Sequence, residues 1–225
     1  MPMWFWFFHV VCTFLRFIVH CALALRYWGK GEKVPKVKNP LLLKSAAKLA
    51  EEIREGKIKS EDVIHAYMER ILEVEPYINA TVDQCFSEAL DEAKEVDVLI
   101  ASGRYSKKQL AEEKPLLGVP ISVKILIIVK GLRCTAGSLL FKDLRAAEDA
   151  PSVALLKKAG AIVIATTNSA EMGMEFETNN ILHGKTCNPF DTSKTSGGSS
   201  GMSFLIAMHG IKISYNSLSS IISSN

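Results

Sequence analysis

The stretch GVPISVKILIIV, residues 118–129, decides the fold class. Its density of valine and isoleucine predicts a strand over residues 119–129 that is buried on both faces of a sheet. A second apolar strand is expected over residues 161–166, after a helix over residues 149–159 that Gly160 closes. Strand, helix and strand with short connections predict a parallel α/β sheet.

Upstream of this unit, apolar residues at helical spacing predict two helices, the first over residues 44–55. We expect Ser60 to cap the second helix and Pro76 to end it. Residues 79–86 alternate like a strand, and residues 87–101 are typical of a third helix. Downstream, residues 171–175 favour a short helical turn, and the Asn-, Gly- and Ser-rich residues 179–201 favour loop.

The N-terminus, residues 1–28, is predicted to be a transmembrane anchor. About 25 apolar residues at a rise of about 1.5 Å would cross a hydrocarbon core of about 30 Å. A re-entrant hairpin is an alternative, and a cleaved signal peptide is another, because Ala22-Leu23-Ala24 resembles a small-x-small cleavage site. The absence of a basic stretch before the segment argues against the signal peptide.

Positive charge gathers at the end of the apolar segment and in the basic linker that follows it, residues 29–42. The formal net charge of the chain is only +3. The cluster comprises Arg26, Lys30, Lys33, Lys36 and Lys38. This is the flank of a membrane segment rather than a nucleic-acid-binding face, so we expect a membrane and no nucleic acid as partner. The positive-inside rule favours a single-pass anchor with a cytoplasmic body. A lumenal body is the alternative, in which the Asn79-Ala80-Thr81 glycosylation sequon would matter.

The cysteines and histidines predict neither a disulfide framework nor a metal site. There are five of each, and the cysteine number is odd with no C-x-x-C pair. Neither set shows the ligand spacing of a zinc site. We therefore expect no metal and no cofactor.

Two segments carry residues suited to chemistry. Lys124 lies inside an otherwise apolar strand, where desolvation favours its neutral form and can make it a base. A strand-end lysine that reaches water is the alternative. The second segment, residues 196–201, joins Gly197 and Gly198 to Ser199 and Ser200, and it could be a ligand-contacting turn, a flexible turn or a phosphate-binding loop. It contains no P-loop and no G-x-G-x-x-G motif.

Taken together, the order and spacing of these segments resemble the amidase-signature family, over roughly residues 43–201. Within that family the chain is most similar to the membrane-anchored fatty-acid amide hydrolases, type 2 especially. The matching motifs are Gly118-Val119-Pro120 with Lys124, Thr135-Ala136-Gly137-Ser138, Glu148-Asp149-Ala150, residues 155–168, Gly184, Asn188-Pro189 and Gly197-Gly198-Ser199-Ser200-Gly201.

The resemblance implies a partial amidase-signature α/β fold, with a mixed, mostly parallel sheet flanked by helices and an N-terminal membrane helix. It implies cleavage of amide bonds, those of fatty-acid amides, by a serine, a cis-serine and a lysine. Lys124 matches the base, and Ser199 matches the bridging serine that follows a cis peptide bond. Gly197, Gly198 and Ser200 belong to the substrate and oxyanion loop. The implied partners are a lipid-like amide substrate, the membrane and a second copy in a homodimer.

The tail departs from the family pattern. A nucleophile in a Gly-Ser/Thr-Asp-x-Gly-Gly-Ser-like segment is expected near residues 217–224, which read SLSSIISS. Ser223 matches by position only, because Ile221 and Ile222 stand where a tight oxyanion turn needs glycines. We therefore expect residues 202–225 to be a non-homologous tail, truncated or altered, and the chain to be inactive. The alternative function is a non-catalytic membrane-anchored fragment or a partner of an intact homologue.

Overall fold

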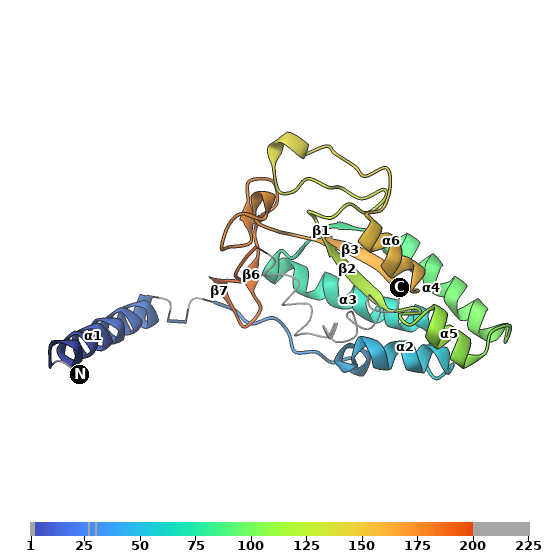
Figure 1. The fold of residues 1–225 in the computed structure, drawn as a ribbon, viewed down its shortest axis with the longest axis horizontal. Coiled ribbons are helices and arrows are strands. Elements are labelled where there is room, and N and C mark those ends of the chain that lie inside the picture. Colours follow the sequence, from blue (N-terminus) through green and yellow to red (C-terminus); the bar gives the residue numbers. More distant parts are fainter. Residues whose placement is uncertain (1–2, 27, 30, 200–225) are drawn as a thin grey trace.

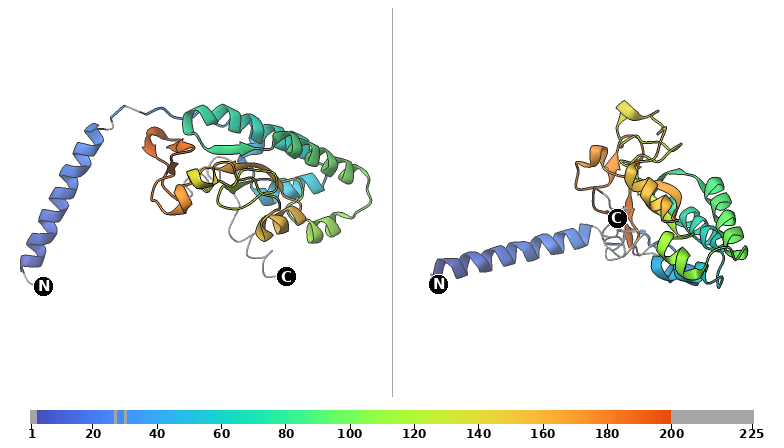
Figure 2. Two further views of the ribbon diagram at one scale, coloured as in Figure 1. Left: turned by 90° about the horizontal axis from the view of Figure 1, so that it is seen from above. Right: turned by 45° about the vertical axis from the view of Figure 1, so that its right-hand side comes forward.

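The structure is a computed structural model that describes residues 3–26, 28–29 and 31–199. It comprises a layered α/β body and one helix, α1 (Met3–Arg26), that stands apart from it (Figure 1). A further view shows the same separation (Figure 2). Within the described residues, Trp4–Arg26 is the one helix long and apolar enough to cross a membrane, and none of its apolar window is buried against the body.

The body is built on a three-stranded sheet in the order β1-β3-β2. The strands are β1 (Thr81–Gln84), β2 (Pro120–Lys124) and β3 (Ile162–Thr167). β2 runs parallel to β3, as the strand–helix–strand pattern predicts, with Lys124 opposite Thr167. β1 joins the other edge of β3 antiparallel, so the sheet is mixed. β3 is therefore central, and all six of its residues are buried.

β2 is shorter than the strand predicted over residues 119–129, because the chain turns directly after the lysine. The Ile125 N–H still donates to the Thr167 carbonyl at 3.0 Å, and then the Ile127 N–H folds back onto the Lys124 carbonyl at 2.8 Å. Ile125 and Val129 remain buried outside the strand. An apolar run of sequence indicates that its residues are buried. It does not by itself indicate how far a strand extends, as the turn after Lys124 shows.

Helices cover both faces of the sheet (Figure 1). On one face lie η1 (Pro40–Leu43), α2 (Ala46–Arg54), α3 (Ser60–Ile78) and α4 (Phe86–Ala101). The other face is covered by α6 (Pro151–Lys158), and α5 (Lys107–Glu113) contacts α2. Side chains alternate along β3 as strand geometry requires. Ile162 and Ile164 pack with the larger helical layer, and Val163 packs with Val153 of α6.

Two predictions about α3 are wrong. Ser60 does not cap the helix, because its hydroxyl donates to the Gly118 carbonyl at 3.1 Å. The Asp97 carboxylate accepts the Ser60 and Glu61 N–H groups instead, at 2.7 and 3.1 Å. Pro76 does not end the helix either, since it lies exposed within the last turn and α3 continues to Ile78.

The chain beyond β3 is more structured than the loop predicted over residues 179–201. The short 3-10 helix η2 (Leu139–Phe141) lies earlier, between β2 and α6. After β3 and η3 (Glu171–Gly173), the chain forms two small antiparallel pairs. One pairs β4 (Asn179–Asn180) with β5 (Gly184–Lys185), and the other pairs β6 (Cys187–Asn188) with β7 (Asp191–Thr195). These strands carry the chain back to the carboxyl end of β2.

Candidate active site

The structure brings together the two residues that the sequence marked for chemistry. Lys124 is the last residue of β2, and its Nζ lies 2.9 Å from the Ser199 Oγ, 75 positions along the chain. Both side chains are half-buried. Burial lowers the pKa of Lys124 below its ordinary value of 10.5. The amine is therefore neutral in a larger fraction of molecules than a surface lysine would be, and a neutral amine can accept a proton.

Ser199 follows a cis peptide bond, as the family resemblance implies, and Gly198 is the residue before it. A Cβ at Gly198 would meet the backbone of Phe176 and Glu177 at 2.6–2.7 Å, so only glycine fits there. Gly197 adopts a positive φ of 83°, a conformation that also favours glycine. The two glycines therefore let the turn lie directly against residues 176–177.

The segment that supports this turn is held by buried amides rather than by apolar packing. Asn180 Nδ2 donates to Asn168 Oδ1 at 2.7 Å and to the Ser169 carbonyl at 2.8 Å. Its own Oδ1 accepts the N–H groups of Leu182 and His183, at 3.1 and 2.8 Å. Asn168 and Asn180 are both buried, at 1% and 8% exposure. Because each buried polar group has a partner, the network ties the end of β3 to the chain that leads to Ser199.

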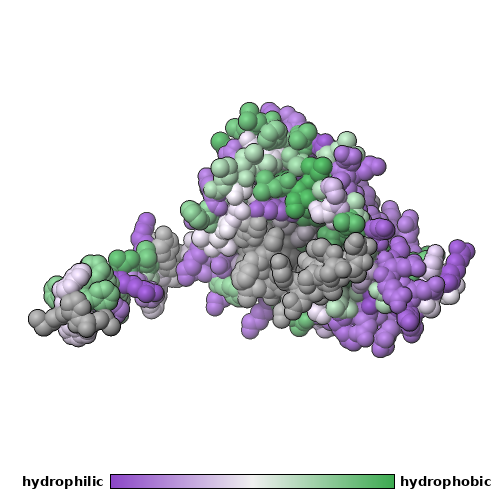
Figure 3. All heavy atoms as spheres, in the orientation of Figure 1, coloured by the Kyte–Doolittle hydropathy of each residue, from purple (hydrophilic) through white to green (hydrophobic). Residues whose placement is uncertain are grey.

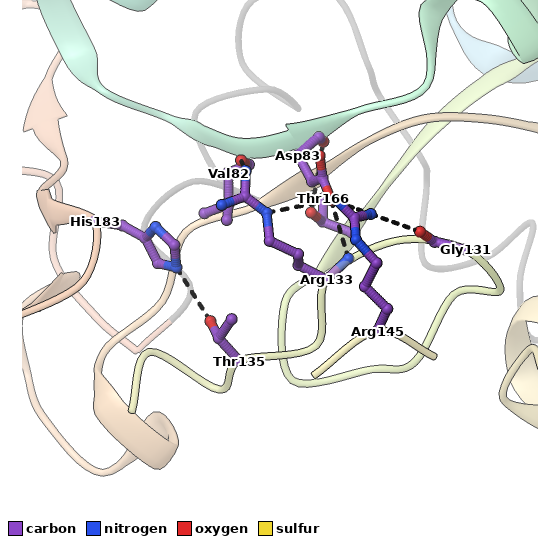
Figure 4. Close-up of polar contacts among 8 residues, drawn as sticks. All are labelled: Val82, Asp83, Gly131, Arg133, Thr135, Arg145, Thr166 and His183. Carbon is purple, nitrogen blue, oxygen red and sulfur yellow. Dashed lines mark hydrogen bonds and ion pairs between the residues drawn. The ribbon is translucent and has the colours of Figure 1, made fainter. Parts of the chain in front are cut away.

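An ion-pair cluster fixes a second loop near the end of the sheet (Figure 4). The Asp83 carboxylate of β1 accepts the Arg133 N–H at 3.0 Å and pairs with the Arg133 and Arg145 guanidinium groups at 3.4 Å. Thr135 Oγ1 lies 3.0 Å from His183 Nε2. Burial, with a smaller contribution from Arg133, lowers the pKa of His183. Sequence reasoning missed this cluster, because its members lie in three separate segments with no local signal.

The 3-10 helix η3 lies against the Lys124–Ser199 pair, and exposed apolar residues follow it in the chain. A Cβ at Gly173 would lie 3.8 Å from Ser199 Oγ and 3.9 Å from Lys124 Nζ, so η3 forms one wall of the site. The neighbouring Met174 and Phe176 are 84% and 95% exposed. Hydrophobic surface also gathers over the segment between β2 and α6 (Figure 3), which includes Leu140 at 87% exposure.

Several predicted site residues lie outside the described residues. These are Ser200, Ser223 and the positions near residues 217–224 where a nucleophile is expected. In the part of the chain that the structure does describe, no group of three His, Cys, Asp or Glu side chains gathers as metal ligands would.

Comparison with protein-family profiles shows to which family the chain belongs. The profile of the family described as Amidase matches residues 62–217. The chain belongs to the amidase family. This confirms the resemblance found in the sequence, and it identifies the β2 lysine and the Gly-Gly-Ser turn as parts of an amidase-signature domain.

Among curated relatives, this amidase-family chain is 47% identical over 169 residues to fatty-acid amide hydrolase 2-A of Danio rerio, which covers 75% of the chain and 32% of the relative. It is 42% identical over 172 residues to human fatty-acid amide hydrolase 2, covering 76% of the chain and 32% of the relative. The chain thus spans about a third of the length of these relatives.

Solved structures agree on the fold. A fatty acid amide hydrolase matches with a TM-score of 0.70 at 26% identity, covering 76% of the chain and 29% of that structure. A bacterial aryl acylamidase of the amidase-signature family matches with a TM-score of 0.69 at 27% identity, covering 76% and 34%. The expected α/β fold with a mixed sheet and flanking helices is confirmed at this level.

Proposed function

We propose that this amidase-family chain carries the base and the proton relay of an amide-hydrolysing site, Lys124 and Ser199. The observation that carries the proposal is their 2.9 Å contact, in which burial lowers the pKa of the lysine. A base must be within hydrogen-bonding reach of the proton it takes, and this pair meets that condition.

The proposed chemistry is acyl transfer. Neutral Lys124 Nζ takes the hydroxyl proton of Ser199, while Ser199 Oγ takes the proton of a nucleophilic serine. The resulting alkoxide attacks the amide carbonyl, and the tetrahedral intermediate expels the amine as the proton returns through Ser199. Water then repeats the attack on the acyl-enzyme. Backbone N–H groups of a nucleophile loop would stabilise the oxyanion, each by about 2.7–4 kcal/mol.

The proposed substrate is a lipid-like amide, such as a fatty-acid amide. Two relatives are named fatty-acid amide hydrolases, and the exposed apolar residues Met174 and Phe176 follow η3, which lies against the pair. We further propose that α1 anchors the chain in a membrane as a single pass, with the body on the cytoplasmic side. Its length and hydropathy support the anchor, and the basic residues that follow it support the orientation.

We propose that residues 1–225 alone do not hydrolyse amides, because SLSSIISS at residues 217–224 lacks the glycines and aspartate of a nucleophile segment. A serine-reactive fluorophosphonate probe tests this. No labelling of the purified chain is expected. Labelling that disappears in Ser223→Ala would overturn the inactive assignment and make Ser223 the nucleophile. Labelling that persists in Ser199→Ala would overturn the relay role of Ser199.

A second candidate function is a non-catalytic partner of an intact homologue. The exposed apolar side chains of Leu140, Met174 and Phe176 favour it, because such surfaces are typical of interfaces. Co-purification of the tagged chain with a co-expressed full-length relative should fall when Leu140 and Phe176 are both changed to Asp. Exposed Val98 of α4, changed to Asp, is the control that should leave the complex intact.

A further inference from the structure

A chain of buried hydrogen bonds runs from the end of α3 to the turn that carries Ser199. Thr186 Oγ1 donates to the Asn79 carbonyl at 2.7 Å, and the Thr186 N–H donates to the Thr178 carbonyl at 2.8 Å. Thr178 then donates twice to the Gly197 carbonyl, from its N–H at 2.9 Å and from its Oγ1 at 2.8 Å. Thr178 and Thr186 are both 0% exposed.

We propose that Thr178 is a positioning residue for the Lys124–Ser199 pair. By holding the Gly197 carbonyl from two directions, it fixes the peptide group two residues before Ser199 and so places the serine hydroxyl at the lysine amine. This inference rests on the proposed function, because positioning matters only if the pair moves a proton.

The turn needs such a clamp because its own residues constrain it poorly. Gly197 and Gly198 have no side chains, and glycine has the widest backbone freedom of any residue. Gly198 lies against the backbone of Phe176 and Glu177, and Thr178 is the next residue along that same segment. The surface that accommodates Gly198 and the clamp on Gly197 therefore belong to one short stretch, so a shift in either moves the whole turn.

The side chain of Thr178 adds something that the backbone cannot. A single N–H to the Gly197 carbonyl leaves the peptide group free to rotate about that bond, whereas a second donor from Oγ1 fixes its direction. Valine has the shape of threonine without the donor, and serine keeps the donor without the methyl group. The two substitutions therefore separate the hydrogen bond from the packing.

The test uses the full chain in detergent micelles and follows acylation of the Lys124 amine by an amine-reactive ester, read by peptide mass spectrometry. If Thr178 positions the turn, Thr178→Val should raise the acylation rate of Lys124 about fivefold, because the turn loses one hydrogen bond to the Gly197 carbonyl and holds the Ser199 hydroxyl less firmly against the amine. Thr178→Ser should label like the parent. Thr135→Val is the matched control, since it removes another fully buried threonine hydroxyl that does not contact Gly197.

An unchanged rate in Thr178→Val, or an equal rise in Thr178→Ser or Thr135→Val, overturns the proposal. Should Thr178→Val lose its cooperative melting transition, hydrogen exchange in the parent chain decides instead. The Thr178 amide should then exchange as slowly as the β3 amides, and rapid exchange overturns the clamp. Neither readout requires turnover, so an inactive chain leaves this test intact, whereas failure of the probe-labelling experiment concerns only the proposed chemistry.

Discussion

The larger helical layer and the segment from β3 to Ser199 are held by different forces. Between α2, α3, α4 and the sheet, apolar side chains such as Leu49, Ile53 and Ile64 are at most 1% exposed. The segment from Asn168 to Ser199 is instead tied by side-chain amides and hydroxyls that bond to side-chain and backbone groups distant in sequence. The stability of the helical layer depends on the apolar area that it buries. The stability of the segment from Asn168 to Ser199 depends on each buried donor and acceptor finding its own partner.

The contrast shows which interactions fix the position of the Ser199 turn. Hydrophobic burial is non-directional, so the helical layer tolerates small shifts without losing much stability. Hydrogen bonds lose most of their strength when their geometry fails, so the polar segment holds the Ser199 turn in one place.

The largest effect is expected from Ile64→Ala in α3, where the side chain is 0% exposed. Lost burial and the cavity left behind should lower the free energy of unfolding by about 2–5 kcal/mol. Urea unfolding followed by circular dichroism measures this. A loss below about 1 kcal/mol would show that the layer collapses around the gap.

A smaller and more local effect is expected from Asn180→Ala. The change leaves Asn168 Oδ1 and the Leu182 and His183 N–H groups without this partner, and it should cost about 1–3 kcal/mol. Hydrogen exchange should speed up over residues 179–186 more than in α3. Asn188→Ala, which removes a local acceptor for Phe190, is the control. Equal acceleration throughout the body would contradict a locally acting network.

The ion-pair cluster of Asp83, Arg133 and Arg145 should contribute less to the free energy of unfolding. Asp83→Asn keeps the shape of the side chain but removes the charge facing Arg133 and Arg145, whose side chains are 39% and 59% exposed. Partly exposed ion pairs are worth about 1 kcal/mol or less, and salt screens them. Thermal melts should show a small loss that shrinks at high salt. A loss that salt does not change would assign the effect to the hydrogen bond with the Arg133 N–H.

The smallest effect is a pH-dependent gain from Lys124→Met. Because burial lowers the pKa of Lys124 in the folded chain, the unfolded chain binds more protons between that lowered pKa and the ordinary value of 10.5. Stability of the parent should therefore rise with pH across that window. Lys124→Met should melt slightly above the parent at pH 7, and the difference should shrink toward pH 10.5. A constant difference would assign the gain to packing instead.

The parts of the fold that bury a periodic stripe could be predicted from the sequence. The apolar spacing of α2 and α3 and the β-branched runs of β2 and β3 identify these elements and their parallel pairing. α5 was missed because Leu110 is its one buried residue, although Ser106 and Gln109 form a capping box that could have marked its start. The short strand pairs β4–β5 and β6–β7 could not be predicted from the local sequence. The residues that hold them in place include Asn79 and Glu32, which lie far away along the chain.

The residues of the candidate site also divide into those that the sequence predicts and those that it does not. Lys124 and Ser199 could be named from motifs, because each is unusual where it stands, and the structure places them together. Thr178, Asn168 and Asn180 could not, because nothing in a threonine or asparagine reveals a carbonyl that lies several residues away in sequence but adjacent in space. Their roles depend on tertiary contacts.

None of the apolar window of α1 is buried against the body, so the packing of the body does not depend on this helix. A body expressed from residue 31 onward should therefore keep the hydrogen bonds and the apolar core described above, whatever segment stands before it.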